Sequence, residues 1–266
     1  MIFESLNPFR KKKVGLALSG GGARGLAHIG VLKVLHDHRI PVDFVAGTSV
    51  GSLIGSLYAG GVNITTLMEI SSKVKWKHFF RIVLSKTGLV SSEEIEKFVI
   101  SLIGKKTFPE MEIPFSAIAV DISTGEKIVM NKGEVYKAVR ASCSFPWMYI
   151  PVKTEHRLLA DGVLEENLPS QTVRNMGADF VIGVDVIPRI KKIDCFNNVL
   201  EIFDRALDIF ILNQNKDPRK NCDVLITPIK EKITSLELDR AQYLVELGEE
   251  AARQAMPKIK SALGIS

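Results

Sequence analysis

Residues 14–25, Val-Gly-Leu-Ala-Leu-Ser-Gly-Gly-Gly-Ala-Arg-Gly, decide the fold of this 266-residue chain. The short apolar run over residues 14–18 ends in consecutive glycines, which predicts a buried strand that enters a tight turn. Apolar residues then recur at helical spacing over residues 25–37, and Pro41 precedes a second short apolar run over residues 44–46. The sequence therefore begins with a strand, a helix and a second strand.

The second apolar run leads directly into Gly47-Thr48-Ser49-Val50-Gly51, after which apolar residues follow a helical period as far as Gly60. A G-x-S-x-G sequence between a strand and a helix is typical of a nucleophile elbow. The tight turn projects the serine hydroxyl, and Gly47 and Gly51 avoid steric clashes. Ser49 is therefore a candidate nucleophile.

Strand and helix patterns continue to alternate along the rest of the chain. Further strands are predicted over residues 115–121, 127–130, 158–160, 180–186 and 224–226. Further helices are predicted from a Ser91 and Glu94 capping box to residue 103, and over residues 136–141, 170–176, 199–212 and 239–255. This alternation indicates an α/β fold with helices covering a mostly parallel sheet.

The length and the hydrophobic content of 46% are enough to bury one large core. We expect one domain over residues 1–266. Within it we expect a tail over residues 1–12, the core motifs over residues 13–186 and a helical C-terminal portion over residues 195–266.

Composition limits the location and the partners. Cys143, Cys195 and Cys222 are odd in number and form no CxxC pair, which argues against a disulfide framework or a structural zinc site and favours the cytoplasm. The apolar run after the basic cluster of residues 10–13 is too short for a signal peptide or a membrane span. A net charge of +5 suits phospholipid headgroups or nucleic acid, and it is equally compatible with a solvated basic face.

Residues 73–86 interleave basic and bulky apolar side chains. The basic ones are Lys73, Lys75, Lys77, Arg81 and Lys86, and the apolar ones are Trp76, Phe79, Phe80, Ile82, Val83 and Leu84. Such a stretch can lie in the headgroup region of a bilayer, which would make the segment from Trp76 to Leu84 a peripheral membrane contact. The alternative is a surface helix whose aromatic residues join the core.

The glycine-rich turn has two chemical interpretations. Gly20, Gly22 and Gly25 fit the G-x-G-x-x-G fingerprint of dinucleotide binding, so a nucleotide-binding or regulatory protein without hydrolase activity is the alternative function. In that fingerprint an acidic residue closes the second strand and meets the ribose. Asp43 opens the predicted strand instead, so the nucleotide hypothesis lacks its ribose anchor.

The second interpretation is an oxyanion hole. The consecutive glycines 20–22 in the loop of residues 20–25 let backbone N–H groups, such as that of Gly21, converge at a helix N-terminus, where negative charge is stabilised. The loop has this role if a nucleophile faces it. Arg24 either braces the loop or binds a phosphate of the substrate.

A serine nucleophile needs a general base. None of the five histidines has the place that an α/β-hydrolase triad expects; these are His28, His36 and His38 on the first helix, His78 in the basic stretch and His156 in a solvated turn. Asp161 ends the short strand predicted over residues 158–160 and precedes Gly162, which places a carboxylate at a tight turn. Asp161 is therefore the candidate base.

Together these motifs resemble those of the patatin-like phospholipases, which carry a G-G-G-x-R/K-G loop, a G-x-S-x-G serine and a later D-G-G or D-G-A aspartate. The matching residues are 20–25, 47–51 and 161–163, with Val163 in place of the family's small residue. The likeness covers residues 13–186 and includes Asp-Ile-Ser-Thr-Gly-Glu at 121–126, Ala-Ser-Cys-Ser-Phe-Pro at 141–146 and Asn-Leu-Pro at 167–169. Compact bacterial members and the catalytic domain of neuropathy target esterase look most similar.

The resemblance implies a three-layer α/β/α fold and a Ser49–Asp161 dyad without a metal or a dissociable cofactor. It also implies a lipid acyl hydrolase that cleaves esters of (lyso)phospholipids or related lipids through an acyl-enzyme, with the oxyanion held by the loop of Gly20, Gly21, Gly22, Arg24 and Gly25. No nucleic-acid partner is expected. A scaffold that keeps the dyad but acts through partners is a further alternative.

Overall fold

The structure is a computed structural model, and it describes residues 12–73, 81–82, 90–146, 148–190, 192, 195–214, 219–235, 237 and 239–265. Its strands are β1 (Val14–Leu18), β2 (Phe44–Thr48), β3 (Arg81–Ile82), β4 (Val90–Ser91), β5 (Phe115–Asp121), β6 (Glu126–Met130), β7 (Val152–Lys153), β8 (Leu158–Asp161), β9 (Phe180–Val184) and β10 (Val224–Ile226). Its longer helices are α1 (Ala27–Asp37), α2 (Val50–Ala59), α3 (Ile64–Lys73), α4 (Glu93–Ile103), α5 (Val135–Ser142), α6 (Ser170–Asn175), α7 (Val199–Gln214) and α9 (Ala241–Leu263).

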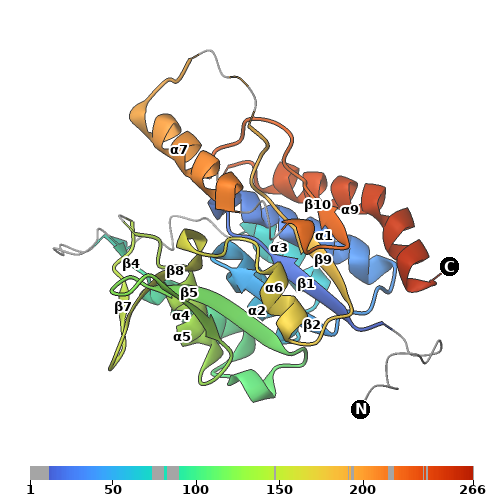
Figure 1. The fold of residues 1–266 in the computed structure, drawn as a ribbon, viewed down its shortest axis with the longest axis horizontal. Helices are drawn as coiled ribbons and strands as arrows, with labels where there is room; N and C mark the ends of the chain where they lie inside the picture. The colour runs from blue at the N-terminus through green and yellow to red at the C-terminus, as the bar shows by residue number, and fades with distance from the viewer. Residues whose placement is uncertain are drawn as a thin grey trace.

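The central sheet of the described chain has the strand order β10-β9-β1-β2-β5-β8-β7, and β6 also pairs with β5 (Figure 1). The strands from β10 to β5 are parallel, whereas β6 and β8 run antiparallel to β5 and β7 runs antiparallel to β8. The prediction of an α/β fold with a mostly parallel sheet is confirmed.

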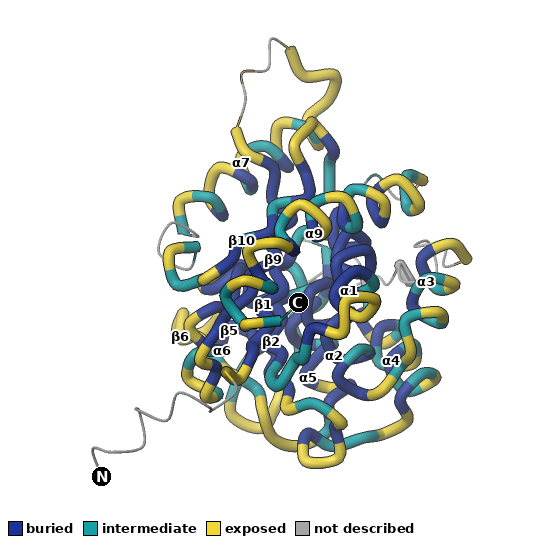
Figure 2. The backbone as a smooth tube through the Cα atoms, turned by 90° about the vertical axis from the view of Figure 1, so that its right-hand side faces the viewer, coloured by how far each residue is buried: buried dark blue, intermediate teal, exposed yellow. Residues whose placement is uncertain are grey.

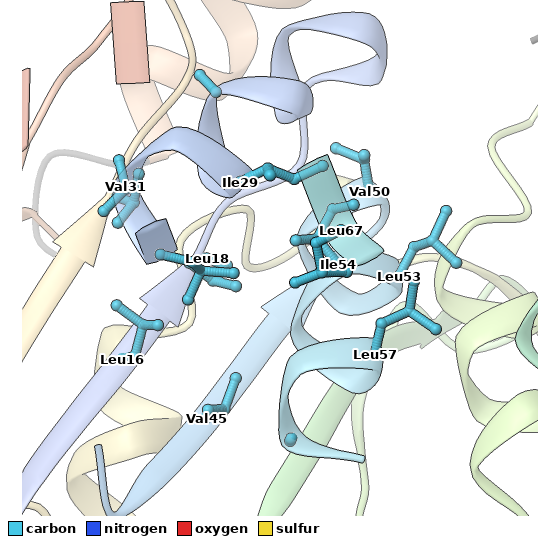
Figure 3. Packing of buried hydrophobic residues seen from close by; sticks show 14 of the residues in the cluster. Leu16, Leu18, Ile29, Val31, Val45, Val50, Leu53, Ile54, Leu57 and Leu67 are labelled. Atoms are coloured by element: carbon cyan, nitrogen blue, oxygen red, sulfur yellow. The ribbon is translucent and has the colours of Figure 1, made fainter. Parts of the chain in front are cut away.

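Helices cover the sheet on both faces. Leu16 and Leu18 of β1 point into the large core, where they pack with side chains of α1, α2 and the surrounding helices (Figure 3). Ala17, between them, points to the opposite face and packs against α6 through Val173. Small side chains on this face allow α6 to approach closely, since a Cβ on Gly15 would lie 2.0 Å from Val173.

The register of β5 brings two chain segments end to end. Its first half pairs with β2, where Thr48 lies opposite Ile118, and its second half pairs with β8, where Asp161 lies opposite Ala119. Because β2 and β8 run in opposite directions, the chain leaves both strands at neighbouring positions of β5. Ser49 and Asp161 therefore approach each other although 112 positions separate them.

Several boundaries differ from the predictions. β9 ends two residues before the predicted residue 186, and α3 was not predicted. The capping box was wrong: α4 starts after Ser92, whose hydroxyl accepts from Arg140 and Ser144 instead of capping the helix. Glu94 pairs with Lys97.

α9 continues eight residues beyond the predicted end and includes Pro257. Proline lacks an N–H and normally ends a helix. Met256 and Ile259 on either side of it are buried in the core, where α9 packs along α1, so packing outweighs the local cost.

The basic and aromatic segment over residues 73–86 lies outside the described residues, apart from Lys73 and the backbone of β3. Its contact with lipid stays a prediction. Across the described part of the chain, every helix is either too short or too polar to cross a bilayer.

Candidate active site

Ser49 lies in a tight turn that requires glycine at positions 47 and 51 of the G-x-S-x-G motif. Its backbone has φ 52° and ψ −127°, a left-handed φ that non-glycine residues rarely adopt. A Cβ on Gly51 would lie 2.3 Å from the Leu18 carbonyl oxygen, and a Cβ on Gly47 would lie 2.3 Å from the Gly51 oxygen. The Ser49 N–H donates to the Ser142 hydroxyl at 3.0 Å, which helps to hold this conformation.

Asp161 is buried at the end of β8, with 1% of its surface exposed. One carboxylate oxygen accepts the Val163 N–H at 2.9 Å, and the Asp161 N–H donates to the Ser144 carbonyl at 3.0 Å. Burial raises the pKa of Asp161 to about 7, while hydrogen bonds from the Ser49 side chain and the Val163 N–H act in the opposite direction. Near neutral pH the carboxyl group can therefore both take up and release a proton.

Ser49 and Asp161 line one cavity of about 450 Å³. The rest of its wall is mostly apolar and includes Val50, Leu53, Ile95, Phe145, Met148, Tyr149, Val163, Ile187, Leu200, Phe203, Leu207 and Ile211. Its volume lies within the range of roughly 300–1,000 Å³ that is usual for small-molecule sites. The cavity joins one hydroxyl and one carboxyl group to a surface that favours an apolar ligand.

The glycine loop forms another part of the cavity wall. The Gly20 N–H is already bonded to Asn167, through the side-chain oxygen at 3.0 Å and the main-chain oxygen at 3.3 Å, and the Ala23 N–H donates to Ser235 at 2.8 Å. The Gly21 and Gly22 N–H groups lie between them, and neither donates to another described residue. These two groups are the candidate donors to an anion in the cavity.

The Arg24 guanidinium is fully buried, with its hydrogen bonds directed at α7 and at the loop between β10 and α9. It donates to Asp208 and Asp204 at 2.6 Å each, and its Nε donates to the Ile233 carbonyl at 2.7 Å. Burial raises the pKa of Asp208 to about 6, against the opposing effect of Arg24. Of the two roles considered for Arg24, this geometry fits the bracing of the loop.

Two polar residues that position the site were not singled out from the sequence. Asn167 fixes Gly20, and Ser142 receives the Ser49 N–H. Both are completely buried. Each lies in a short motif shared with the patatin-like pattern, but their partners lie far away along the chain.

The histidines do not contribute to the cavity wall in the described chain. His28 is buried, with Nε2 2.8 Å from the Ser19 carbonyl, and burial lowers its pKa to about 4, which keeps the ring neutral. His156 is exposed. No group of three His, Cys, Asp or Glu side chains in the described ranges is arranged to hold a metal ion.

The nucleotide hypothesis lacks support from the geometry. Asp43 accepts the Val14 N–H at 2.7 Å, at the start of β1, whereas the glycine loop begins after Leu18 at the other end of that strand. A ribose bound beside the loop therefore cannot reach Asp43.

A mostly parallel α/β sheet with a serine at a strand-to-helix turn defines the class of α/β proteins that carry a nucleophile elbow. Within this class, the family model described as patatin-like phospholipase matches residues 16–173, which is more than half of the chain. The chain belongs to the patatin-like phospholipase family.

Several relatives carry names from the neuropathy target esterase group. The chain is 34% identical to neuropathy target esterase sws of Drosophila melanogaster over 181 residues, which are 65% of this chain and 13% of the relative. It is 31% identical to lysophospholipase NTE1 of Pyricularia oryzae over 181 residues, 66% of this chain and 12% of that protein. An uncharacterized NTE family protein of Mycobacterium tuberculosis is 30% identical over 177 residues, 65% of this chain and 49% of the relative. The chain thus spans at most about half the length of these relatives.

Two solved structures share the fold at low sequence identity. VipD from Legionella pneumophila has a TM-score of 0.56 and 14% identity, over 94% of this chain and 67% of that chain. The type III effector protein ExoU has a TM-score of 0.53 and 14% identity, over 94% of this chain and 54% of that chain. These similarities support the architecture in Figure 1.

Proposed function

We propose that this protein is a lipid acyl hydrolase in which Ser49 is the nucleophile and Asp161 its general base. The observation that carries the proposal is their convergence in one apolar cavity, where burial raises the pKa of Asp161 to about 7. A general base works best with a pKa near the working pH, whereas an exposed aspartate near its ordinary value of 3.8 would accept a proton poorly.

In the first step the Ser49 Oγ forms a bond to the ester carbonyl carbon while its proton passes to the Asp161 carboxylate. The carbonyl oxygen becomes an oxyanion, and the N–H groups of Gly21 and Gly22 are placed to donate to it. The bond between the carbonyl carbon and the alcohol oxygen then breaks. The departing alcohol takes the proton from Asp161, which leaves an acyl group on Ser49.

In the second step water attacks the acyl carbon and gives a proton to Asp161. The bond to the Ser49 Oγ breaks, the fatty acid leaves, and the proton returns to the hydroxyl. The dyad therefore needs no metal or cofactor to complete a cycle.

The cavity wall favours an acyl chain, because transfer of apolar surface out of water is favourable. Two relatives are named as a lysophospholipase and as neuropathy target esterase, which makes a lysophospholipid the first substrate to test. Asp204 and Asp208 already pair with the Arg24 guanidinium. The proposal therefore does not require Arg24 to bind the phosphate of the substrate.

The test is hydrolysis of lysophosphatidylcholine and of p-nitrophenyl butyrate. Ser49→Ala and Asp161→Asn should each lower turnover by at least about 10³-fold with the fold intact, since each removes a group that takes part in every bond change. Ser56→Ala is the matched serine control, because its hydroxyl donates only to Leu53 in the same helix. Asp121→Asn is the matched buried carboxylate control. Turnover retained by either dyad variant would rule out the proposed roles.

A further inference from the structure

α7 exposes an unusual amount of apolar surface. Six of the eleven large hydrophobic residues that are exposed in the described chain lie on this helix: Val199, Leu200, Ile202, Phe203, Ile209 and Phe210. Val199 alone has 74% of its surface exposed. In Figures 1 and 2 the helix leans away from the sheet, with exposed segments along its length. Contiguous apolar surface of this kind marks a contact with another molecule.

The exposed face is continuous with the wall of the candidate active site. Leu200 and Phe203 are exposed and also line the cavity that holds Ser49. Farther round the helix, Leu207 and Ile211 also line the cavity, but Leu207 is half-buried and Ile211 is buried. A lipid that enters from the exposed face therefore meets apolar side chains of α7 in the wall of the cavity that holds Ser49.

Ion pairs hold α7 against the glycine loop. Arg24 bonds to Asp204 and Asp208 on the inner side of the helix, and the Ser235 N–H also donates to Asp204, at 3.2 Å. The outer residues Ile202, Ile209 and Phe210 take no part in this network or in the cavity wall. The helix is thus anchored on one side while its apolar outer side stays in contact with solvent.

Cationic side chains lie beside the first turn of α7. A second cavity of about 320 Å³ borders the helix. The cations in its wall, Arg24, Arg189, Lys192, Arg205, Lys230 and Lys232, outnumber the carboxylates, which are those of Glu201, Asp204, Asp208 and Glu231. The Lys232 ammonium lies 5.9 Å from the ring centre of the exposed Phe196 and pairs with Glu201 at 2.6 Å. Bulky apolar residues next to lysine and arginine are typical of segments that lie at the surface of an anionic bilayer.

We propose that α7 docks the protein on an anionic phospholipid bilayer, with Ile202, Ile209 and Phe210 inserted among the acyl chains and the neighbouring cations at the lipid phosphates. A bilayer fits better than a protein partner, because the exposed face leads into the cavity and a protein seated there would cover the cavity's apolar rim. The inference rests on the proposed function, since the bilayer would be the source of the ester.

The test measures sedimentation with vesicles in the Ser49→Ala background, so that binding is observed without hydrolysis. We expect binding to vesicles of phosphatidylcholine and phosphatidylglycerol in equal parts, and weaker binding to phosphatidylcholine alone. Ile202→Gln, Ile209→Gln and Phe210→Gln combined should lower the partition coefficient at least ~10-fold. The matched control combines Ile122→Gln and Val129→Gln, which remove exposed apolar residues elsewhere and should leave binding unchanged.

The two proposals fail in different ways. With Ser49 intact, the triple variant should keep its turnover of p-nitrophenyl butyrate and lose turnover of lipid in vesicles. Unchanged vesicle binding by the triple variant would overturn the inference, even if the chain hydrolyses esters. If the wild type is then a dimer and the triple variant a monomer, the exposed face of α7 is a contact with a second copy of the chain. Equal binding to both vesicle types would overturn the proposed preference for anionic lipid. If the triple variant does not fold, Val199→Gln with Ile202→Gln provides the same readout.

Discussion

Replacing Asp161 should stabilise the protein, and the gain should depend on pH. The folded state holds the carboxyl group with a pKa of about 7, against its ordinary value of 3.8, mainly because the group is buried. Between these values the folded protein binds a proton that the unfolded chain has released. The stability of the wild type therefore falls as pH rises through this window, whereas an Asp161→Asn variant has no such group to titrate.

The magnitude follows from the width of the window. The pKa difference is about three pH units, and each unit corresponds to about 1.4 kcal/mol. The advantage of the Asp161→Asn variant in free energy of unfolding should thus grow to about 4 kcal/mol once pH exceeds the folded pKa. The amide oxygen can still accept the Val163 N–H, so that buried donor keeps its partner in the variant.

The assay is urea denaturation of both proteins at about pH 5 and about pH 8. The stability difference should increase by about 3 kcal/mol between these conditions, because the window covers about two pH units above pH 5. Ser49→Ala is the control, since it keeps the carboxyl group and its stability should still fall as pH rises. The loss of the Ser49 hydrogen bond raises the pKa of Asp161 further, so the fall should extend to slightly higher pH. A difference that is constant with pH, or a variant that is less stable at pH 8, would refute the assignment of a destabilised carboxylate at this position.

Three further predictions concern turnover and stability. The value of kcat/KM on a soluble ester should rise tenfold per pH unit up to about pH 7 and then level off, because Asp161 must be deprotonated to act as a base; a flat profile between about pH 5 and 7 would contradict this. Gly22→Ala should cost at least about 10²-fold in kcat, since its Cβ would lie 2.4 Å from the Ser235 oxygen and would displace a candidate oxyanion donor, whereas Gly125→Ala, with a similarly positive φ and open space, should keep activity. Arg24→Met should cost about 3–5 kcal/mol at neutral pH, because it leaves Asp208 buried without its cation. That loss should be smaller below about pH 6, where Asp208 is protonated in the wild type as well as in the variant. Thermal unfolding that shows the same loss at about pH 5 and about pH 7 would argue against the ion pair.

The parts of the site that local sequence encodes were predictable. The strand and turn of residues 14–25 follow from apolar runs and glycines, and β1, β5 and β10 have the predicted bounds. Ser49 was recognisable because steric crowding at its turn requires glycine on both sides. These features depend on neighbours within a few residues.

The long-range features were not predictable. The partners of Arg24 on α7 lie 180 and 184 positions away, and no local pattern connects them. α3 is a different case, because Ile64, Leu67 and Met68 recur at helical spacing and pack on the core, so a local pattern for this helix was present in the sequence. The end-to-end meeting of β2 and β8 depends on strand register along β5, which a single sequence does not reveal.

Labelling with a fluorophosphonate tests the central proposal most directly, because the reagent forms a stable bond with an activated serine hydroxyl. The proposal predicts one adduct per chain on the peptide that contains Ser49, with labelling abolished in Ser49→Ala and strongly slowed in Asp161→Asn. An adduct on another residue, or labelling of Ser49 at the same rate without the Asp161 carboxylate, would contradict it.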